Sequence, residues 1–305
     1  MAGIAGLAQP HAGSEASIPI AGPGRVAKQA QAAAPRPADA AGAGFSPVTR
    51  HWRDFKSGVE LRKHFQDIAD AVRSRTLDIG RPQYAMSLAV GVWEAICCGY
   101  GEIAAVEMGV AGGNGMLSLC KAAAFFRDTM EIDIRVYGFD NAAGLPAPVD
   151  YRDHPELWHE GQFVLRDPDA LREKLPPFAE LIVGDIAETV AAFEEVLQRR
   201  KLAFVAVDVD FYSSTMACFG MLEWAPECYL PVVPFYFDDM EESFVFNNWC
   251  GEELAINEFN DAHRWRKFQR YTRFRIRHFF GLHVLDHKIR SGAERPPLPV
   301  HISPI

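Results

Sequence analysis

Acidic side chains follow two apolar runs of the chain, at the point where each predicted strand ends. Asp208 and Asp210 come after the run 204–207, and Asp238 and Asp239 come after a later run. Because the carboxyl ends of neighbouring parallel strands face one crevice, we expect these carboxylates to converge there. Carboxylates that lie so close together need a compensating charge, and Mg²⁺ prefers such hard oxygen ligands. The pattern predicts a magnesium site built from Asp208 or Asp210 with Asp238 and Asp239.

A second interpretation of the same aspartates gives each of them a separate role. Asp208 would bind the amine of a cofactor, while Asp210 or Ser213 would cap the following helix. One of the neighbours Asp238 and Asp239 would then be exposed to solvent. The residue types and their spacing leave both interpretations open.

A glycine-rich turn follows another apolar run, which ends at Glu107 and Met108. The segment 109–115 reads GVAGGNG and leads into a predicted helix. Glycines let the backbone turn sharply and approach a ligand closely, and the amides of the turn and of the helix N-terminus form a polar cradle. A turn of this kind serves a dinucleotide, a sulfonium cofactor or no ligand at all.

Three acids near the turn narrow the choice of ligand. Asp140 ends the next predicted strand, where an acid accepts hydrogen bonds from ribose hydroxyls in doubly wound sheets. Glu107 suits a cofactor with a cationic amino-acid tail better than one with a pyrophosphate. Asp185 would contact an adenine amino group, cap the next helix in a capping box with Glu188, or do both. The alternative is a capping Asp140 and a partly solvated Glu107, with no ligand implied.

Short apolar runs alternate with helical patterns from about residue 102 onwards. The runs predicted as strands are 103–108, 134–139, 181–183, 204–207 and 232–237. The segments predicted as helices between them are 114–127, 186–200 and 214–225. Strands that alternate with helices imply parallel βαβ units and a sheet covered on both faces. The sequence therefore predicts an α/β fold with a Rossmann-like, doubly wound, mostly parallel sheet.

The segments that flank this sheet are predicted as helices and as an edge hairpin. Apolar residues at helical spacing predict an N-terminal lead-in of two helices, over 58–75 and 83–99. A last helix over 252–268 is followed by the runs 273–280 and 282–287. Gly281 between these two runs predicts an antiparallel C-terminal hairpin at the sheet edge.

Basic residues crowd into the segment 264–277, with apolar or aromatic side chains between them. One interpretation is a solvated helix end that runs into an amphipathic strand. The other is a basic rim that holds an anionic substrate or a partner.

The predicted domain boundaries follow from these elements and from composition. Residues 1–48 are rich in Ala, Gly and Pro and carry too few large apolar side chains to offset chain entropy, so we expect a disordered tail. Residues 49–100 are expected to form the helical lead-in, 101–290 the α/β domain, and 291–305 a C-terminal tail.

Charge and cysteine content argue against several classes of protein. The net charge of −9 disfavours nucleic acid and anionic membrane surfaces as partners. No run of about 18 apolar residues predicts a transmembrane helix, and the N-terminus does not read as a secretory leader. The six cysteines lack paired C-x-x-C spacing, so we expect reduced thiols, no zinc site and a cytoplasmic protein. A homo-oligomer is compatible with the sequence, which does not fix the oligomeric state.

Taken in series, these motifs resemble the class I S-adenosylmethionine-dependent methyltransferases, and more narrowly the macrocin O-methyltransferase type. The matching segments, which span about 102–240, are 106–115, 137–140 with 144–146, 184–185 with 188–189, 208–215 and 237–239. Met240 departs from the family, which often has Tyr at this position. The resemblance implies Mg²⁺-assisted methylation of a hydroxyl on a small molecule such as a sugar or natural product.

The resemblance also assigns roles to residues of this chain. The residues expected to bind S-adenosylmethionine are Glu107, Gly109, Ala111, Gly113, Asn114, Asp140, Asp185 and Asp208. The expected metal ligands are Asp208, Asp210, Asp238 and Asp239, and the first three of these would act in catalysis. A general base is sought among His154, His159, His278 and His283. The segment 145–163 is expected to cover the crevice, with Trp158 and His159 lining an acceptor pocket or packing on the sheet rim.

Two other functions remain open from the sequence. A nicotinamide-dependent dehydrogenase would share the Rossmann-like sheet, although hydride transfer does not need the carboxylates that follow the fourth and fifth strands. A cofactor-binding protein without turnover would carry the same binding motifs, because motifs alone do not prove catalysis.

Overall fold

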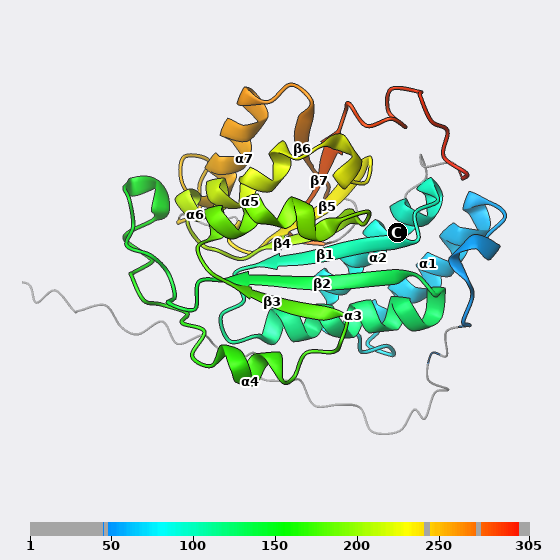
Figure 1. The fold of residues 1–305 in the computed structure, drawn as a ribbon, viewed down its shortest axis with the longest axis horizontal. Helices are drawn as coiled ribbons and strands as arrows, with labels where there is room; N and C mark the ends of the chain where they lie inside the picture. The colour runs from blue at the N-terminus through cyan, green and yellow to red at the C-terminus, as the bar shows by residue number, and fades with distance from the viewer. Residues whose placement is uncertain (1–44, 46–47, 241–244, 273–275, 299–305) are drawn as a thin grey trace, which may run out of the picture. The chain divides into compact units, whose positions relative to one another are not determined.

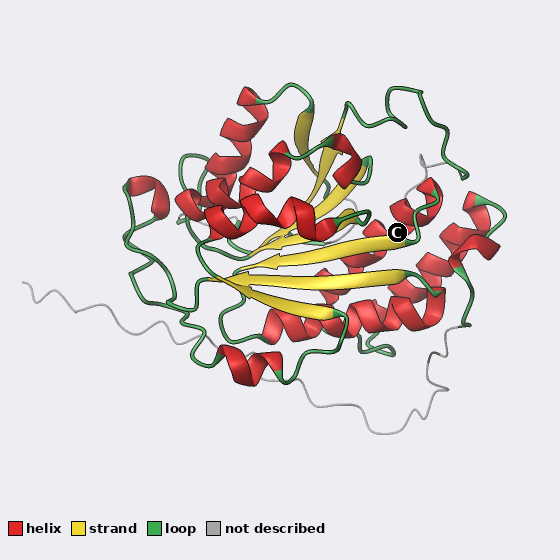
Figure 2. Cartoon of the chain, viewed as in Figure 1, coloured by secondary structure: helices red, strands yellow, loops and turns green. Residues whose placement is uncertain are grey.

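A computed structural model describes residues 45, 48–240, 245–272 and 276–298 of the chain. Everything below concerns the unit Gly44–Ile305, since the unit Met1–Ala43 and the tail predicted for it lie outside the described residues. Helices and strands alternate along most of this unit, as Figure 2 shows. None of the helices in the described part of the chain is long and apolar enough to cross a membrane.

One mixed sheet organises the fold. Its strands in chain order are β1 (Glu102–Met108), β2 (Asp133–Asp140), β3 (Ala179–Val183), β4 (Lys201–Val207), β5 (Val232–Phe237), β6 (Arg266–Arg270) and β7 (Phe279–Val284). They lie side by side in the order β3-β2-β1-β4-β5-β7-β6. The first five are parallel, and β7 pairs antiparallel with both β5 and β6. The predicted α/β fold, with a mostly parallel sheet and an antiparallel C-terminal edge, is confirmed.

Helices cover both faces of the sheet (Figure 1). The helices on the first face are α1 (Gly58–Arg73), α2 (Pro82–Cys98) and α3 (Asn114–Met130). Those on the other face are α5 (Ile186–Leu197), α6 (Tyr212–Cys218) and α7 (Gly251–Ala262), while α4 (Pro168–Arg172) contacts the edge strand β3. The predicted lead-in is therefore present as α1 and α2, although the domain boundaries themselves stay a prediction. The helix predicted over 214–225 is shorter, because α6 ends at Cys218 and a 3₁₀ turn, Phe219–Glu223, follows it.

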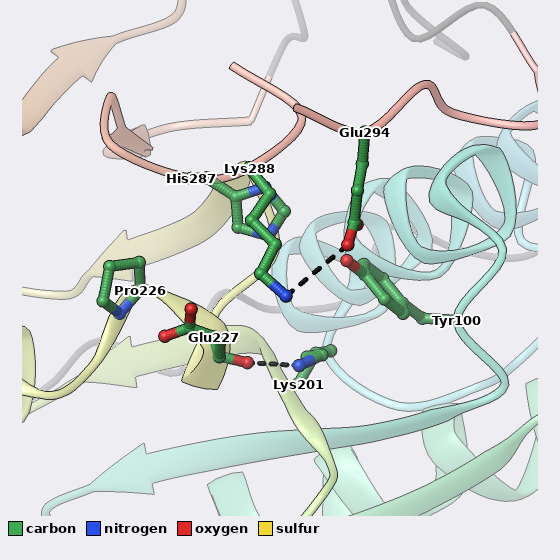
Figure 3. Close-up of a pocket in the computed structure, with 7 residues that line it drawn as sticks. All are labelled: Tyr100, Lys201, Pro226, Glu227, His287, Lys288 and Glu294. Atoms are coloured by element: carbon green, nitrogen blue, oxygen red, sulfur yellow. Dashed lines mark hydrogen bonds and ion pairs between the residues drawn. The ribbon is translucent and has the colours of Figure 1, made fainter. Parts of the chain in front are cut away.

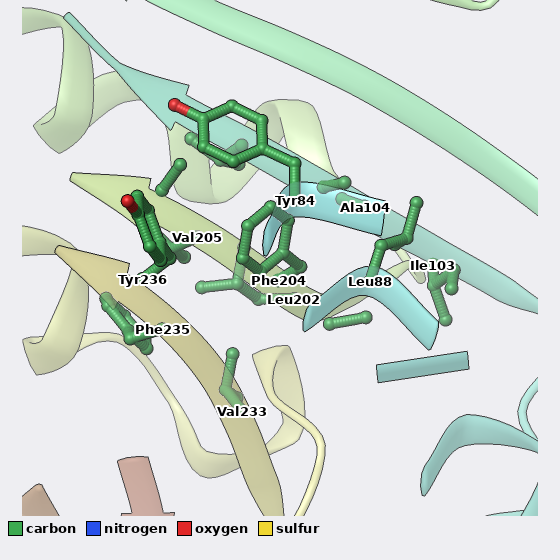
Figure 4. Close-up of a cluster of buried hydrophobic side chains, with 14 of the residues drawn as sticks. Tyr84, Leu88, Ile103, Ala104, Leu202, Phe204, Val205, Val233, Phe235 and Tyr236 are labelled. Atoms are coloured by element: carbon green, nitrogen blue, oxygen red, sulfur yellow. The ribbon is translucent and has the colours of Figure 1, made fainter. Parts of the chain in front are cut away.

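The core between α2 and the central strands is mostly apolar. Figure 4 shows Leu88 of α2 beside Ile103 of β1, with Leu202 of β4 in the same cluster, and these side chains are fully buried. Burying each such side chain contributes about 1.5–3 kcal/mol. Tyr84 and Tyr236 lie at the carboxyl ends of the strands with their ring centroids 5.6 Å apart. Their hydroxyls place polar groups at this end of the core, beside the carboxylates described below.

The C-terminal hairpin exists, but its strands differ from the prediction. The segment 266–270, expected as the end of a helix, forms β6, and Gly281, expected as the turn, lies inside β7 between Pro234 and Gln269. Asn260 explains where β6 starts, because its side-chain oxygen accepts from the Phe268 amide (2.7 Å) and its nitrogen donates to the Phe268 carbonyl (2.9 Å). These two bonds hold the chain extended directly after α7.

Glycine is needed at position 281 because of its neighbours in space. A Cβ there would lie 2.9 Å from the ring of Tyr271 and 3.0 Å from Val232 Cγ1. A glycine inside a strand often marks such a close approach rather than a turn. Gly281 is therefore a point of close approach inside β7, and the turn predicted at this position is wrong.

The basic segment 264–277 is mostly engaged by the protein itself. Arg266 is buried and pairs with Asp286, and Lys267 donates to the Asn260 carbonyl. Arg270 lies 4.0 Å from a Glu253 carboxylate oxygen. Residues 273–275 lie outside the described residues. The interpretation as an amphipathic strand therefore describes 266–270, although no helix end runs into it.

Candidate functional site

The glycine turn connects the end of β1 to the start of α3. Gly109 has a φ of 84°, and a Cβ there would overlap the carbonyl oxygen of Asp208 at the end of β4. Gly113 has a φ of 81° and lies directly before Asn114, the first residue of α3. These conformations favour glycine, and the close approach of the turn to β4 explains why a side chain at 109 is not accommodated.

Asp140 holds the turn in place from the end of β2. Its Oδ2 accepts hydrogen bonds from the amides of Val110 (3.0 Å) and Ala111 (2.8 Å). Its Oδ1 accepts from the amide of Ala142 at 2.7 Å. The ordered turn accounts for the φ of 45° at Ala111, which a residue with a Cβ adopts only when its surroundings impose it. Asp140 thus ends β2 as predicted, and its bonds shape the glycine turn, while its expected role in ribose binding stays a prediction.

Glu107 lies beneath the turn and is buried. Its Oε1 accepts a hydrogen bond from the Tyr84 hydroxyl at 2.8 Å, while its Oε2 is buried with no hydrogen-bond partner among the described residues. Burial raises the pKa of this carboxyl to about 8, and the hydrogen bond from Tyr84 opposes that shift only in part. A Cβ on Gly115 would overlap Oε1, so the first turn of α3 lies directly on this carboxyl group. The expected partly solvated Glu107 of the alternative interpretation is wrong.

The start of α2 supplies two residues that the sequence analysis did not identify. Tyr84 contacts Glu107 as described, and an Arg81 guanidinium nitrogen lies 3.7 Å from Asp208 Oδ2 and 3.4 Å from the Tyr84 hydroxyl. Arg81 precedes Pro82 at the helix start, a pattern that indicates only a helix boundary. No periodicity could have linked these residues to acids that lie far along the chain.

The structure brings the four predicted aspartates to one edge of the sheet. Asp208 and Asp238 follow the paired strand ends Val207 and Phe237, and the Asp238 amide donates to the Val207 carbonyl at 3.0 Å. Asp210 is buried and has a φ of 63°, which turns the chain sharply after β4. Burial, followed by the charges of Asp210, Asp208 and Asp238, raises the pKa of Asp239 well above its usual range.

A fifth carboxylate joins this cluster from α7. Glu252 is fully buried, and its Oε2 accepts a hydrogen bond from the Asp239 amide at 3.0 Å. Its Oε1 and the Oδ2 of Asp239 are buried without a hydrogen-bond partner in the described part of the chain. Burial, together with Asp239, raises the pKa of Glu252 well above its usual range. Local pattern does not single out Glu252, because it lies in an ordinary first turn of a helix.

The carboxylates are near one another but are not arranged as a metal site. Within residues 48–240, 245–272 and 276–298, no group of three or more His, Cys, Asp or Glu side chains has an arrangement that could hold a metal ion. The magnesium site expected from Asp208, Asp210, Asp238 and Asp239 therefore stays a prediction.

Asp185 caps α5, as one of its two expected roles requires. Its Oδ1 accepts from the amides of Ala187 (2.9 Å) and Glu188 (3.3 Å). The side chain is exposed at the carboxyl end of β3, two strands away from the glycine turn. A contact with adenine is compatible with this position and stays a prediction.

The segment that follows β2 contacts the start of α6 through Asp153. This residue is buried, and its Oδ1 accepts from the Ser213 amide at 2.8 Å while its Oδ2 accepts from the Ser213 hydroxyl at 2.9 Å. The Val149 amide also donates to Oδ2, at 2.8 Å. Asp153 thereby fixes the segment on the first turn of α6. Trp158 packs against Phe163, with ring centroids 5.7 Å apart.

The four candidate histidines lie in different places. His154 is buried against Glu156, and His159 is exposed. His283 pairs with Val232 at the amino end of β5, so it lies at the far end of that strand from Asp238. His278 is buried and stacks on Tyr236, with Nδ1 placed 3.1 Å from the Phe237 carbonyl oxygen. His278 is thus adjacent to the carboxyl end of β5, and the His154 ring lies close to Gly251, which directly precedes Glu252 in α7.

A small pocket of about 100 Å³ opens beside Asp239. The residues that line it are Asp239, Met240, Phe246, Asn247, Asn248, Cys250, Glu253 and Arg270. It combines two amide groups, one guanidinium and two carboxyl groups with a thiol and two apolar side chains. Such a lining suits a small polar molecule, and Met240, where the resembled family often has Tyr, forms part of its wall.

No protein-family model matches this chain, and no curated protein matches it. Solved structures match at low identity. The calicheamicin methyltransferase CalS11 is 18% identical, with 80% of this chain and 99% of that chain covered and a TM-score of 0.49. The O-methyltransferase NovP is 16% identical, covering 66% and 77% with a TM-score of 0.44. An O-methyltransferase from Bacillus cereus in complex with SAH is 16% identical, covering 73% and 88% with a TM-score of 0.37. At these identities and TM-scores, the likenesses assign no activity, substrate or metal to this chain.

Proposed function

We propose that the chain is an S-adenosylmethionine-dependent O-methyltransferase that acts on a hydroxyl of a small molecule, with Mg²⁺ assistance. The observation that carries this proposal is Glu107, whose buried Oε2 has no described partner directly beneath the glycine turn. A buried carboxyl group of this kind is costly to keep unless a ligand uses it. The ammonium of an amino-acid tail is the complementary group, and a dinucleotide does not carry one.

The order of the sheet also supports this proposal over a dehydrogenase. Dinucleotide-binding sheets have the order 3-2-1-4-5-6. Here the order is 3-2-1-4-5-7-6, with β7 antiparallel between β5 and β6. The strands next to β5 therefore differ from those of a dinucleotide-binding sheet.

Each residue around the turn would bind a different part of the cofactor. Glu107 would bind the ammonium, and the amides at Gly109 to Gly113 would approach the amino-acid tail. Asp140 would bind ribose through lone pairs that its bonds to the turn leave available, since each carboxylate oxygen accepts more than one hydrogen bond. Asp185 would lie on the adenine side. Arg81 would balance the charge of Asp208 at the edge of this site.

The carboxylate cluster supplies the type of oxygen ligand that Mg²⁺ prefers, although no group of three among its described side chains is already arranged to hold an ion. Burial and the neighbouring carboxylates raise the pKa values of Asp239 and Glu252 and so favour their protonated forms, whereas a bound cation would favour the ionised forms. Asp208 or Asp210 with Asp238 and Asp239 would hold Mg²⁺. When bound, this ion would lower the pKa of the acceptor hydroxyl.

The transfer itself is an in-line displacement at the methyl carbon. The C–S bond breaks with its electron pair left on sulfur, the O–C bond forms, and the hydroxyl proton leaves to a base. The acceptor oxygen must be held about 3 Å from the methyl carbon, which the pocket beside Asp239 would accomplish through Asn247 and Arg270. His278 would take the proton. A proton on its Nδ1, donated to the Phe237 carbonyl, would leave the Nε2 lone pair free to accept.

Calorimetric titration of the full chain with S-adenosylhomocysteine and, separately, with NAD tests the cofactor. We expect saturable binding of S-adenosylhomocysteine only, and binding of NAD alone would refute the proposal. A transfer assay with radiolabelled S-adenosylmethionine and a set of hydroxylated acceptors then tests turnover.

The metal is tested with D238A and D239A, each assayed with and without added Mg²⁺ after chelation. Loss of transfer in both variants, with S-adenosylhomocysteine binding retained, is expected. Full activity of the variants in chelator would remove Mg²⁺ from the proposal and leave the cofactor assignment standing.

A further inference from the structure

A second pocket lies at the opposite end of the sheet from the glycine turn. It has a volume of about 130 Å³, and the residues that line it are Tyr100, Lys201, Pro226, Glu227, His287, Lys288 and Glu294 (Figure 3). Lys201 is the first residue of β4, and Asp208 follows the last one. A single water needs about 10–15 Å³ on a comparable measure, so the pocket has room for a small molecule.

The floor of this pocket carries a lysine without a carboxylate partner. The Lys201 ammonium donates to the Glu227 backbone carbonyl and lies 5.2 Å from the centre of the Tyr100 ring. Among the described residues, no carboxylate is within ion-pair distance of it, and Figure 3 shows the Glu227 carboxylate pointing away from it. Burial lowers the pKa of Lys201, which reflects the cost of a half-buried cation with incomplete compensation.

His287 adds a second donor to the floor. Its ring is buried, and its Nδ1 accepts from the Ile289 amide at 3.2 Å. This bond assigns the ring proton to Nε2 when the imidazole is neutral. Burial, followed by the charge of Lys201, lowers the pKa of His287 and so favours the neutral form at pH 7. The ring stands edge-on to Tyr100, with centroids 6.5 Å apart.

An exposed ion pair at the rim of the pocket can exchange its partner. Lys288 and Glu294 are 3.5 Å apart, and both side chains are about half exposed, at 51% and 49%. Exposed pairs of this kind contribute about 0–1 kcal/mol, so a ligand can replace Glu294 as the partner of Lys288 at little cost.

We propose that this pocket binds a small oxyanion, a phosphate or a carboxylate, through the ammonium groups of Lys201 and Lys288 and the Nε2–H of His287. All three groups donate hydrogen bonds, and charge-assisted bonds to an oxyanion are about twice as strong as neutral ones. The anion also supplies the counter-charge that Lys201 lacks. The site is independent of the proposed methyl transfer, because no residue of its lining belongs to the glycine turn or to the carboxylate cluster.

Calorimetric titration of the full chain with inorganic phosphate, at constant ionic strength set with sodium chloride, tests the proposal. We expect saturable binding that weakens roughly tenfold in K201Q and about threefold to tenfold in K288Q, as for the loss of one charge-assisted bond. Lys288 is exposed, so K288Q keeps the test valid even where K201Q folds poorly. The matched control is K174Q, an exposed lysine outside the lining.

The same titration with acetate separates the two sources of the anion. Tighter binding of phosphate indicates a phosphorylated ligand, and tighter binding of acetate a carboxylate. Equal phosphate affinity in the unsubstituted chain, K288Q and K201Q, or the absence of saturable binding of both anions, overturns the proposal. Binding of S-adenosylhomocysteine is measured in parallel, and we expect K288Q to leave it unchanged. A failure of this pocket is therefore distinguishable from a failure of the proposed function.

Discussion

Replacement of Glu107 by Gln should stabilise the protein and weaken cofactor binding at the same time. The carboxyl group is buried, and its pKa of about 8 lies far above the ordinary value of 4.5. Because the raised pKa belongs to the folded state, the folded chain keeps a proton that the unfolded chain releases above pH 4.5. The contribution of Glu107 to stability therefore falls as the pH rises from 4.5 to 8, and it changes little outside that window.

The magnitude follows from the size of this window. For each pH unit between the two pKa values, the free energy of unfolding falls by about 1.4 kcal/mol. At pH 7 the total loss is about 3 kcal/mol. Gln at position 107 removes this cost and still offers its side-chain oxygen to the Tyr84 hydroxyl. The same change removes the charge that would bind an ammonium, so we expect affinity for S-adenosylhomocysteine to fall roughly 10- to 100-fold.

Urea unfolding of both proteins at several pH values from 5 to 8.5 measures the stability, and calorimetry measures the affinity. The difference in unfolding free energy between E107Q and the unsubstituted chain should widen with pH. A matched control is E94Q in α2, because burial also raises the pKa of Glu94 to about 8. Glu94 lies in the same helix as Tyr84, but at the end of that helix away from the glycine turn. E94Q should show a similar pH-dependent gain and unchanged affinity. Parallel pH profiles for E107Q and the unsubstituted chain would show that Glu107 is ionised throughout, and the reasoning would be wrong.

Four further substitutions probe the elements that position the site. G115A places a Cβ against Glu107, so we expect a loss of about 1–3 kcal/mol in urea unfolding, and an unchanged midpoint would contradict this packing. D153A removes both bonds to Ser213 at the start of α6 and should cost about 1–3 kcal/mol, whereas S213A, which keeps the bond to the amide, should cost less. Y84F removes the only described hydrogen bond to the Glu107 side chain and should raise the pKa of that carboxyl, which would extend the pH-dependent window to higher pH.

Most strands of the sheet can be predicted from the local pattern of apolar residues. Each parallel strand lies within two or three residues of its predicted range. The central strands β1, β4 and β5 are buried on both faces and are therefore near-continuous apolar runs in the sequence. The glycine turn and Asp140 were also placed correctly relative to each other, since the βαβ connection brings the ends of β1 and β2 together. The prediction was wrong where side-chain pairing outweighed local preference, as when Asn260 holds 266–270 extended as β6.

The amino-acid sequence alone determined the parallel sheet, the turn at its carboxyl edge and the convergence of aspartates from β4 and β5, because periodicity and βαβ connections are local properties. Only the tertiary structure decided which groups are buried without partners and which are bonded. The contacts of Arg81 and Tyr84 with the site, the fifth carboxylate at Glu252 and the pocket floor at Lys201 join segments far apart in the chain. Such contacts depend on how the helices pack on the sheet, and no spacing within one segment encodes them.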